Sequence, residues 1–182
     1  MQRDNQRKFL QQMILACVFT ALTTVLTFFI KIPSHNGYIH LGDTIIYIAA
    51  CLLPTPLAMV CGALGGLLAD TFGGFIIYII PTAIIKALLP FAFTCKSEKI
   101  ICKRNLLALI PASLITIIGY YIAEVIIICF SSGDLLSYIT TSYPWITAVY
   151  CLPGNAIQAL GSAIAFIFIA PALDKIKIKD KI

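Results

Sequence analysis

Four ionisable side chains lie within or beside long apolar stretches of the sequence: Asp43, Asp70, Lys86 and Glu124. An ionised group in hydrocarbon costs at least about 2.5–3.5 kcal/mol on insertion scales, so such residues usually face a cavity or one another. Glu124 has no neighbouring turn or helix end that explains its place, and we interpret it as a solute-binding group. Lys86 can contact a solute as well, or it can pair internally with Glu124 or Asp70.

Asp43 and Asp70 each have a structural alternative to ligand binding. Asp43 stands at the start of an apolar segment, where a carboxylate can cap exposed backbone N–H groups. Asp70 precedes the pair Gly73-Gly74 and can belong to a turn. Both remain candidate ligands, because the predicted segments place them near the same side of the membrane as Glu124.

Amide and aromatic side chains are predicted at the same depth. Asn155 and Gln158 follow a Pro-Gly pair, and Tyr78, Tyr120 and Trp145 lie in the same halves of their segments. A small polar heteroaromatic solute needs flat rings to stack on and a few directional polar partners; the alternative for the aromatics is an interfacial belt. The predicted substrate-binding residues are Glu124, Asn155, Gln158, Tyr120, Tyr78, Lys86, Trp145, Asp43 and Asp70.

The composition predicts that a membrane surrounds these residues. Hydrophobic residues make up 60% of the 182 and charged residues 12%, against about 45–50% and about 25% in soluble domains. We expect an all-α membrane protein of one domain, residues 1–182, because no linker or repeat divides it. Six segments are apolar and about long enough to cross a bilayer: 9–32, 41–53, 57–71, 75–94, 106–130 and 144–173.

The basic residues predict the orientation of these six transmembrane helices. With the N-terminus inside, all of the thirteen Lys and Arg residues except Lys31 and Lys86, eleven in total, fall on one side. Lys and Arg near helix ends favour the cytoplasm. We therefore predict that the N- and C-termini are both cytoplasmic.

Several classes of function are disfavoured by what the sequence lacks. The basic clusters form no face interleaved with aromatics, so we expect no nucleic-acid partner. Seven cysteines without CxxC spacing predict neither a disulfide framework nor a zinc site. His35 and His40 share one loop with no further histidine, and there is no P-loop. We expect no metal, no cofactor and no catalytic residues, and hence no enzyme.

Three short runs carry a resemblance to a known family: GYIHLGD at 37–43, GALGGLLAD at 62–70 followed by two glycines, and Pro81-Thr82 followed by Lys86. The chain resembles the S components, the membrane-embedded substrate-binding subunits, of energy-coupling factor (ECF) vitamin transporters. The resemblance implies a six-helix bundle that captures a vitamin or precursor from outside. It also implies docking on a transmembrane coupling subunit driven by two cytoplasmic ATPases, and toppling within the bilayer to deliver the cargo.

The resemblance extends to the first helix and to the choice of cargo. S components carry small residues spaced four apart on helix one, where the coupling subunit approaches; in place of a pair of alanines, this chain has Ala16 with Thr20 and Cys17 with Ala21. Related subgroups take the hydroxymethylpyrimidine precursor of thiamine, pyridoxine-like compounds or riboflavin. We favour a small pyrimidine or pyridine, since Glu124 can accept a hydrogen bond while Tyr or Trp stacks on the ring. A self-sufficient secondary carrier and a non-transporting membrane scaffold remain the alternatives.

Overall fold

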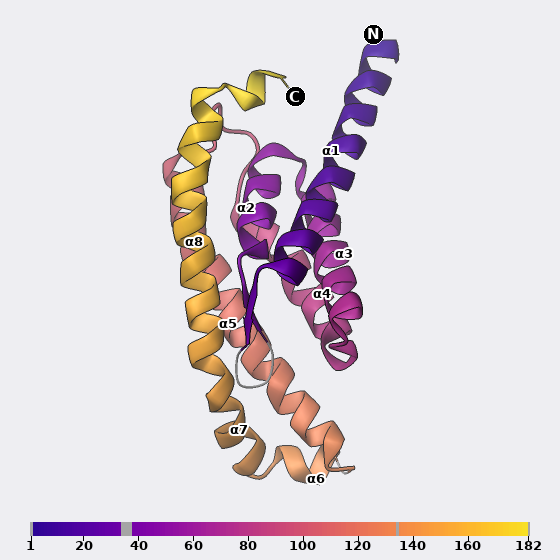
Figure 1. The fold of residues 1–182 in the computed structure, drawn as a ribbon, viewed down its shortest axis with the longest axis vertical. Coiled ribbons are helices and arrows are strands. Elements are labelled where there is room, and N and C mark those ends of the chain that lie inside the picture. Colours follow the sequence, from indigo (N-terminus) through magenta and orange to yellow (C-terminus); the bar gives the residue numbers. More distant parts are fainter. Residues whose placement is uncertain (1, 34–37, 134, 182) are drawn as a thin grey trace.

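The computed structural model describes residues 2–33, 38–133 and 135–181, and its longer helices run side by side along one long axis (Figure 1). The helices are α1 (Gln2–Phe29), α2 (Gly42–Leu52), α3 (Thr55–Gly73), α4 (Ile79–Leu88), α5 (Lys103–Ser131), α6 (Leu135–Ile139), α7 (Tyr143–Ala148) and α8 (Leu152–Lys175). Short 3₁₀ turns lie at Ile76–Tyr78, Leu89–Ala92, Val149–Cys151 and Ile178–Lys181. A hairpin of β1 (Lys31–Pro33) and β2 (Tyr38–His40) connects α1 to α2.

Four helical segments are long and apolar enough to cross a bilayer: residues 6–29 of α1, all of α3, all of α5, and Tyr143–Lys175, which contains α7 and α8. Two shorter apolar helical segments, Gly42–Leu52 and Ile76–Ala92, complete the set. These six correspond to the six predicted segments. Large apolar side chains such as Ile80 and Phe168 are exposed on the outside of the bundle, which suits hydrocarbon as the surrounding solvent.

Two connecting segments differ from the prediction. The first helix ends at Phe29 rather than at residue 32, because Lys31–Pro33 pairs with Tyr38–His40 as antiparallel strands. Strands of three residues are too short to show an alternating pattern in a sequence. The predicted loop positions His35 and Gly37 lie outside the described residues. The stretch between the last two spans contains the unpredicted helix α6.

The short helix α2 occupies the centre of the bundle. Nine of its eleven residues are buried, and apart from Asp43 and Thr44 its side chains are almost all apolar, as expected of a helix surrounded by protein. Its Tyr47 stacks on Phe93 with 5.0 Å between ring centroids and meets Phe166 of α8 edge-on at 6.2 Å. An 11-residue helix is too short to span a bilayer alone, so it depends on this packing.

Helix α3 brings α1 and α4 close together through glycines. A Cβ atom at position 65 would lie 2.7 Å from the Thr23 side chain of α1, and one at position 66 would lie 2.7 Å from the Thr82 methyl of α4. The Thr24 hydroxyl of α1 donates to the Gly65 carbonyl at 3.2 Å. Small residues permit such close backbone approach where lipid gives no hydrophobic drive for association.

Both ends of the chain lie at the same end of the bundle (Figure 1). There Asp174 of α8 accepts hydrogen bonds from the backbone N–H groups of Ile100 and Ile101 at 2.7 and 2.9 Å. The Lys179 ammonium donates to the carbonyls of Cys95 and Ser97 at 3.1 and 2.6 Å. These bonds tie the C-terminal segment to the connection between α4 and α5.

Candidate solute-binding pocket

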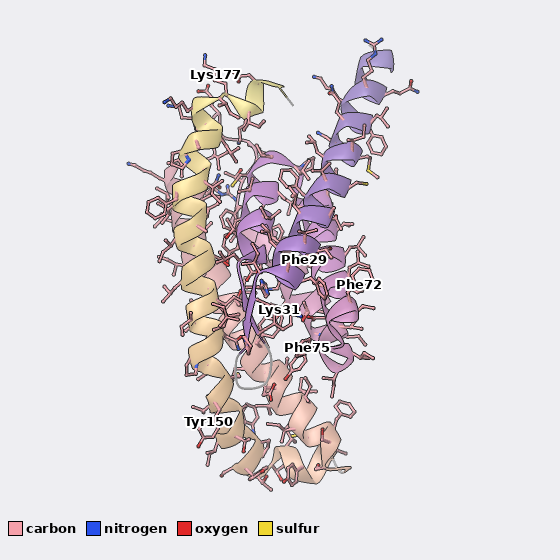
Figure 2. The ribbon with its side chains drawn as sticks, in the orientation of Figure 1. Phe29, Lys31, Phe72, Phe75, Tyr150 and Lys177 are labelled. Atoms are coloured by element: carbon pink, nitrogen blue, oxygen red, sulfur yellow. The ribbon has the colours of Figure 1, made fainter. Side chains whose placement is uncertain are left out.

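A pocket opens in the half of the bundle away from the termini. Strand β2, the end of α3, the start of α4, the middle of α5 and the start of α8 surround it, and Phe75 lies in the corresponding half of Figure 2 while Lys177 lies at the other end. The space amounts to about 590 Å³ including its open mouth. Its lining residues are Tyr38, Ile39, His40, Asp70, Phe75, Tyr78, Thr82, Tyr120, Glu124, Cys151, Gly154, Asn155 and Gln158.

Six of the nine predicted substrate-binding residues line this pocket: Asp70, Tyr78, Tyr120, Glu124, Asn155 and Gln158. Asp43 and Lys86 do not line it. Trp145 lies outside the pocket lining on α7; its side chain is 40% exposed, and its indole N–H donates to the Ile139 carbonyl at 2.9 Å. The structure therefore gathers the predicted residues of α3, α5, α8 and the 3₁₀ turn before α4, and leaves Asp43, Lys86 and Trp145 outside the lining.

Each carboxylate in the pocket accepts a hydrogen bond from a tyrosine. The Tyr78 hydroxyl donates to Glu124 Oε2 at 2.6 Å, and the Tyr38 hydroxyl donates to Asp70 Oδ1 at 2.6 Å. Among the residues that the structure describes, the second oxygen of Asp70, Oδ2, is buried and has no hydrogen-bond partner. A buried acceptor without a donor is costly, so this oxygen suits a donor supplied by a solute.

His40 contributes a donor to the same pocket. Its Nδ1 accepts a hydrogen bond from the Gly42 backbone N–H at 3.0 Å, which places the proton of a neutral imidazole on Nε2. Burial in the segment between the first two spans, and then the charge of Lys86, lower the pKa of His40 to about 3, although Asp43 opposes the shift. His40 is therefore neutral at physiological pH and offers an N–H.

A buried ion pair lies behind the lining residues. The Lys86 ammonium contacts Asp43 Oδ1 at 2.5 Å, with 1% and 0% of the two side chains exposed. Gln158 Nε2 donates to the other oxygen of Asp43 at 3.1 Å. The Lys86 nitrogen also lies 5.2 Å from the centroid of the Tyr120 ring. An ion pair this deep needs additional hydrogen bonds to offset desolvation, and Gln158 supplies one.

This pair corrects two expectations. The structural alternative for Asp43, a helix cap, is wrong: Leu41 occupies the N-cap position of α2, no side-chain capping bond occurs there in the described structure, and Asp43 reaches Lys86 instead. The internal partner that the structure gives Lys86 is Asp43, in place of the expected Glu124 or Asp70. The physical reason is the central burial of α2, which removes Asp43 from water and makes a cation from α4 its necessary partner.

Sequence reasoning missed the residues that the hairpin and its neighbours contribute. Tyr38 and His40 reach the pocket because β2 folds back against the bundle. Phe75 packs on Tyr38 with 4.8 Å between ring centroids, and Thr82 accepts a 3.2 Å hydrogen bond from the Tyr120 hydroxyl. The motif at residues 37–43 contains both Tyr38 and His40, but the sequence predicts substrate binding only for its Asp43 and places His40 in an outer loop.

The two small-residue pairs of α1 face different ways. Ala16 is 7% exposed and packs inward, where its carbonyl accepts hydrogen bonds from Thr20 at 2.8 Å and from the Cys61 thiol of α3 at 3.3 Å. Cys17 and Ala21 are exposed on the outer face. Only the second pair is therefore fully available to a partner in the membrane.

Apolar helices around a polar pocket define the class of this chain as an integral membrane protein with a pocket between its helices. A family model described as "ECF-type riboflavin transporter, S component" matches residues 8–175. The chain therefore belongs to this family, whose members are membrane-embedded components of transporters and not enzymes. Membership implies that it works with an ECF module and a vitamin substrate. No curated protein matches the chain.

Proposed function

We propose that this chain is the substrate-binding subunit of an ECF importer and that it captures riboflavin from outside the cell. One observation supports this most directly: aromatic rings, two carboxylates and two amides line a single pocket, in a chain whose matching family model is named for riboflavin. Such a mixture of rings and directional polar groups suits a flat, polar heterocycle.

Riboflavin fits the chemistry of the pocket better than the small rings favoured from the sequence. A flavin has three fused rings for stacking, an imide N–H and chain hydroxyls that donate, and carbonyl and ring-nitrogen acceptors. The rings of Tyr38, Phe75, Tyr78 and Tyr120 border the pocket. Asp70 offers an unpartnered acceptor and His40 an N–H donor. A single pyrimidine or pyridine would leave part of this lining without a partner.

We propose that all six apolar segments cross the membrane, with both termini in the cytoplasm and the pocket open to the outside. Support comes from the basic residues, eleven of thirteen of which are predicted on the side of the termini. In a cysteine-free version of the chain, a cysteine introduced at Ser132 should react with an impermeant thiol reagent in intact cells. One introduced at the exposed Glu98 should not, and equal labelling of both would contradict this topology.

Delivery of the cargo would require partners. We propose that a transmembrane coupling subunit, driven by two cytoplasmic ATPases, docks against the outer face of α1 that contains Cys17 and Ala21. The exposure of both small side chains supports this choice of surface, since small residues allow helices to pack closely in lipid.

Titration of purified protein with riboflavin tests the proposal, because bound flavin changes its fluorescence. We expect saturable one-to-one binding that neither pyridoxine nor hydroxymethylpyrimidine displaces. If the protein bound pyridoxine or hydroxymethylpyrimidine but did not bind riboflavin, the choice of substrate would be overturned. In liposomes, riboflavin uptake should require the ECF module and ATP; uptake by the chain alone would favour the self-sufficient carrier, and no binding at all would favour the scaffold.

A further inference from the structure

The buried ion pair behind the pocket reaches the solute space through one side chain, Gln158. Asp43 uses both of its oxygens inside the protein, Oδ1 toward Lys86 and Oδ2 toward Gln158 Nε2. Gln158 is 3% exposed and also lines the pocket. It is therefore the element through which the charge state of the pair can affect a bound solute.

The ionised carboxylate decides which way the Gln158 amide faces. A carboxylate only accepts hydrogen bonds, whereas a carboxamide has a donating NH₂ on one side and an accepting oxygen on the other. Gln158 can meet ionised Asp43 only through its NH₂, as the 3.1 Å contact shows. The carbonyl oxygen on the opposite side of the amide is then left for the pocket.

Lys86 is what keeps this carboxylate ionised. Asp43 is fully buried, and a buried carboxylate without its cation is neutralised by taking up a proton. A protonated Asp43 could donate its O–H to the Gln158 oxygen. The amide would then be free to turn and present its NH₂ to the pocket, so that an acceptor site would become a donor site.

Contacts with α3 and α5 fix the position of the Lys86 side chain beside Asp43. Its aliphatic chain passes beside Gly66 of α3, where a Cβ atom would lie 3.1 Å from Lys86 Cγ. Its nitrogen lies 5.2 Å from the centroid of the Tyr120 ring, and Tyr120 is one of the residues that separate the ion pair from the solute space. Lys86 thus lies behind the pocket without lining it.

We propose that Lys86 is a positioning residue that sets the hydrogen-bond polarity of the pocket: through Asp43 it holds the Gln158 carbonyl oxygen toward the solute, so that the pocket selects a ligand with a donor at that point. This inference rests on the proposed function, because the donor is taken to be an N–H or O–H of riboflavin. It assigns to Lys86 an effect on specificity rather than a direct contact with the substrate.

A double-mutant cycle on riboflavin affinity tests the proposal, with Lys86→Met, Gln158→Leu and their combination measured by flavin fluorescence titration. Each single change should weaken binding about tenfold, the equivalent of one lost hydrogen bond. The combination should bind no more weakly than Gln158→Leu alone, because Lys86 acts through Gln158. Lys179→Met is the matched control: it removes a lysine bonded to the carbonyls of Cys95 and Ser97 at the other end of the bundle, and affinity should not change.

If Lys86→Met does not yield folded protein, Lys86→Met/Asp43→Asn replaces it in the cycle. This pair leaves no buried charge unpaired, and an asparagine at position 43 accepts either orientation of the amide, so the same coupling to Gln158 is expected. Losses that multiply to about 100-fold in the combined variant, or unchanged affinity without Lys86, would overturn the inference alone. Absence of riboflavin binding in the unmodified chain would overturn the proposed function together with it.

Discussion

The Tyr78 hydroxyl, in the 3₁₀ turn before α4, donates a 2.6 Å hydrogen bond to Glu124 of α5 across the pocket wall. The Glu124 side chain is thereby fixed at the solute space although only 5% of it is exposed. Lys86 contacts another carboxylate, that of Asp43. Because Glu124 also lines the pocket, we propose that its carboxylate contacts the ligand.

Replacement of Glu124 by glutamine should weaken ligand binding without unfolding the protein. The amide oxygen can still accept from Tyr78, but the charge-assisted bond to the ligand is lost, which costs about 1.5–3 kcal/mol or roughly 10–150-fold in affinity. Fluorescence titration gives the affinity and a melting curve without ligand gives the stability. Tyr78→Phe is the control, because it removes the hydrogen bond from Tyr78 to Glu124 and leaves the carboxylate in place. Wild-type affinity in Glu124→Gln would remove this residue from the site.

Asp70→Asn should lower the affinity for riboflavin without lowering the stability of the ligand-free protein. The unpartnered Oδ2 of Asp70 is a cost to the ligand-free protein, so removal of the buried charge should leave the melting temperature unchanged or raise it. Riboflavin affinity should fall by about tenfold or more, since the acceptor for a ligand donor is lost. Ligand-induced thermal stabilisation should shrink in parallel. A large drop in ligand-free stability would instead indicate a structural role for this carboxylate.

Gly66→Ala should destabilise the bundle, because the added methyl would meet the Thr82 methyl at 2.7 Å and the Lys86 chain at 3.1 Å. Overpacking of this kind typically costs about 1–3 kcal/mol, which a lower melting temperature would show. Gly161→Ala is the matched control on α8, where the new Cβ would find only an ordinary 3.4 Å contact with Leu41. Equal melting temperatures for both variants would contradict the close packing of α3 on α4.

The six apolar segments could be predicted because each carries its own signal of length and composition. Glu124 and Asn155 could be selected for a similar reason, since a polar group in an apolar helix requires an explanation. The partner of Asp43 could not be predicted: residues 43, 86 and 158 meet only through the tertiary packing of α2, α4 and α8. The contribution of Tyr38 depends on a three-residue strand whose pairing leaves no periodic pattern.

The burial of α1 residues predicts that two substitutions of similar kind will act differently. Ala21→Trp, on the exposed face, should reduce co-purification with the coupling subunit while riboflavin affinity stays at the wild-type value. Ala16→Leu, at a position only 7% exposed against α3, should lower the melting temperature of the isolated chain. Unchanged complex yield with Ala21→Trp would refute this face of α1 as the docking surface.

The pH dependence of stability should report on His40. Burial lowers its pKa to about 3 in the folded protein, whereas a histidine in the unfolded chain has a pKa of about 6.5. Between these values the unfolded state binds a proton that the folded state does not, so stability falls as the pH drops. From pH 7.5 to 5.5 the loss should be about 1.4 kcal/mol. His40→Asn keeps an acceptor for the Gly42 N–H and should remove this part of the slope in unfolding curves. An unchanged slope in His40→Asn would show that the pKa of His40 is the same in the folded and the unfolded protein.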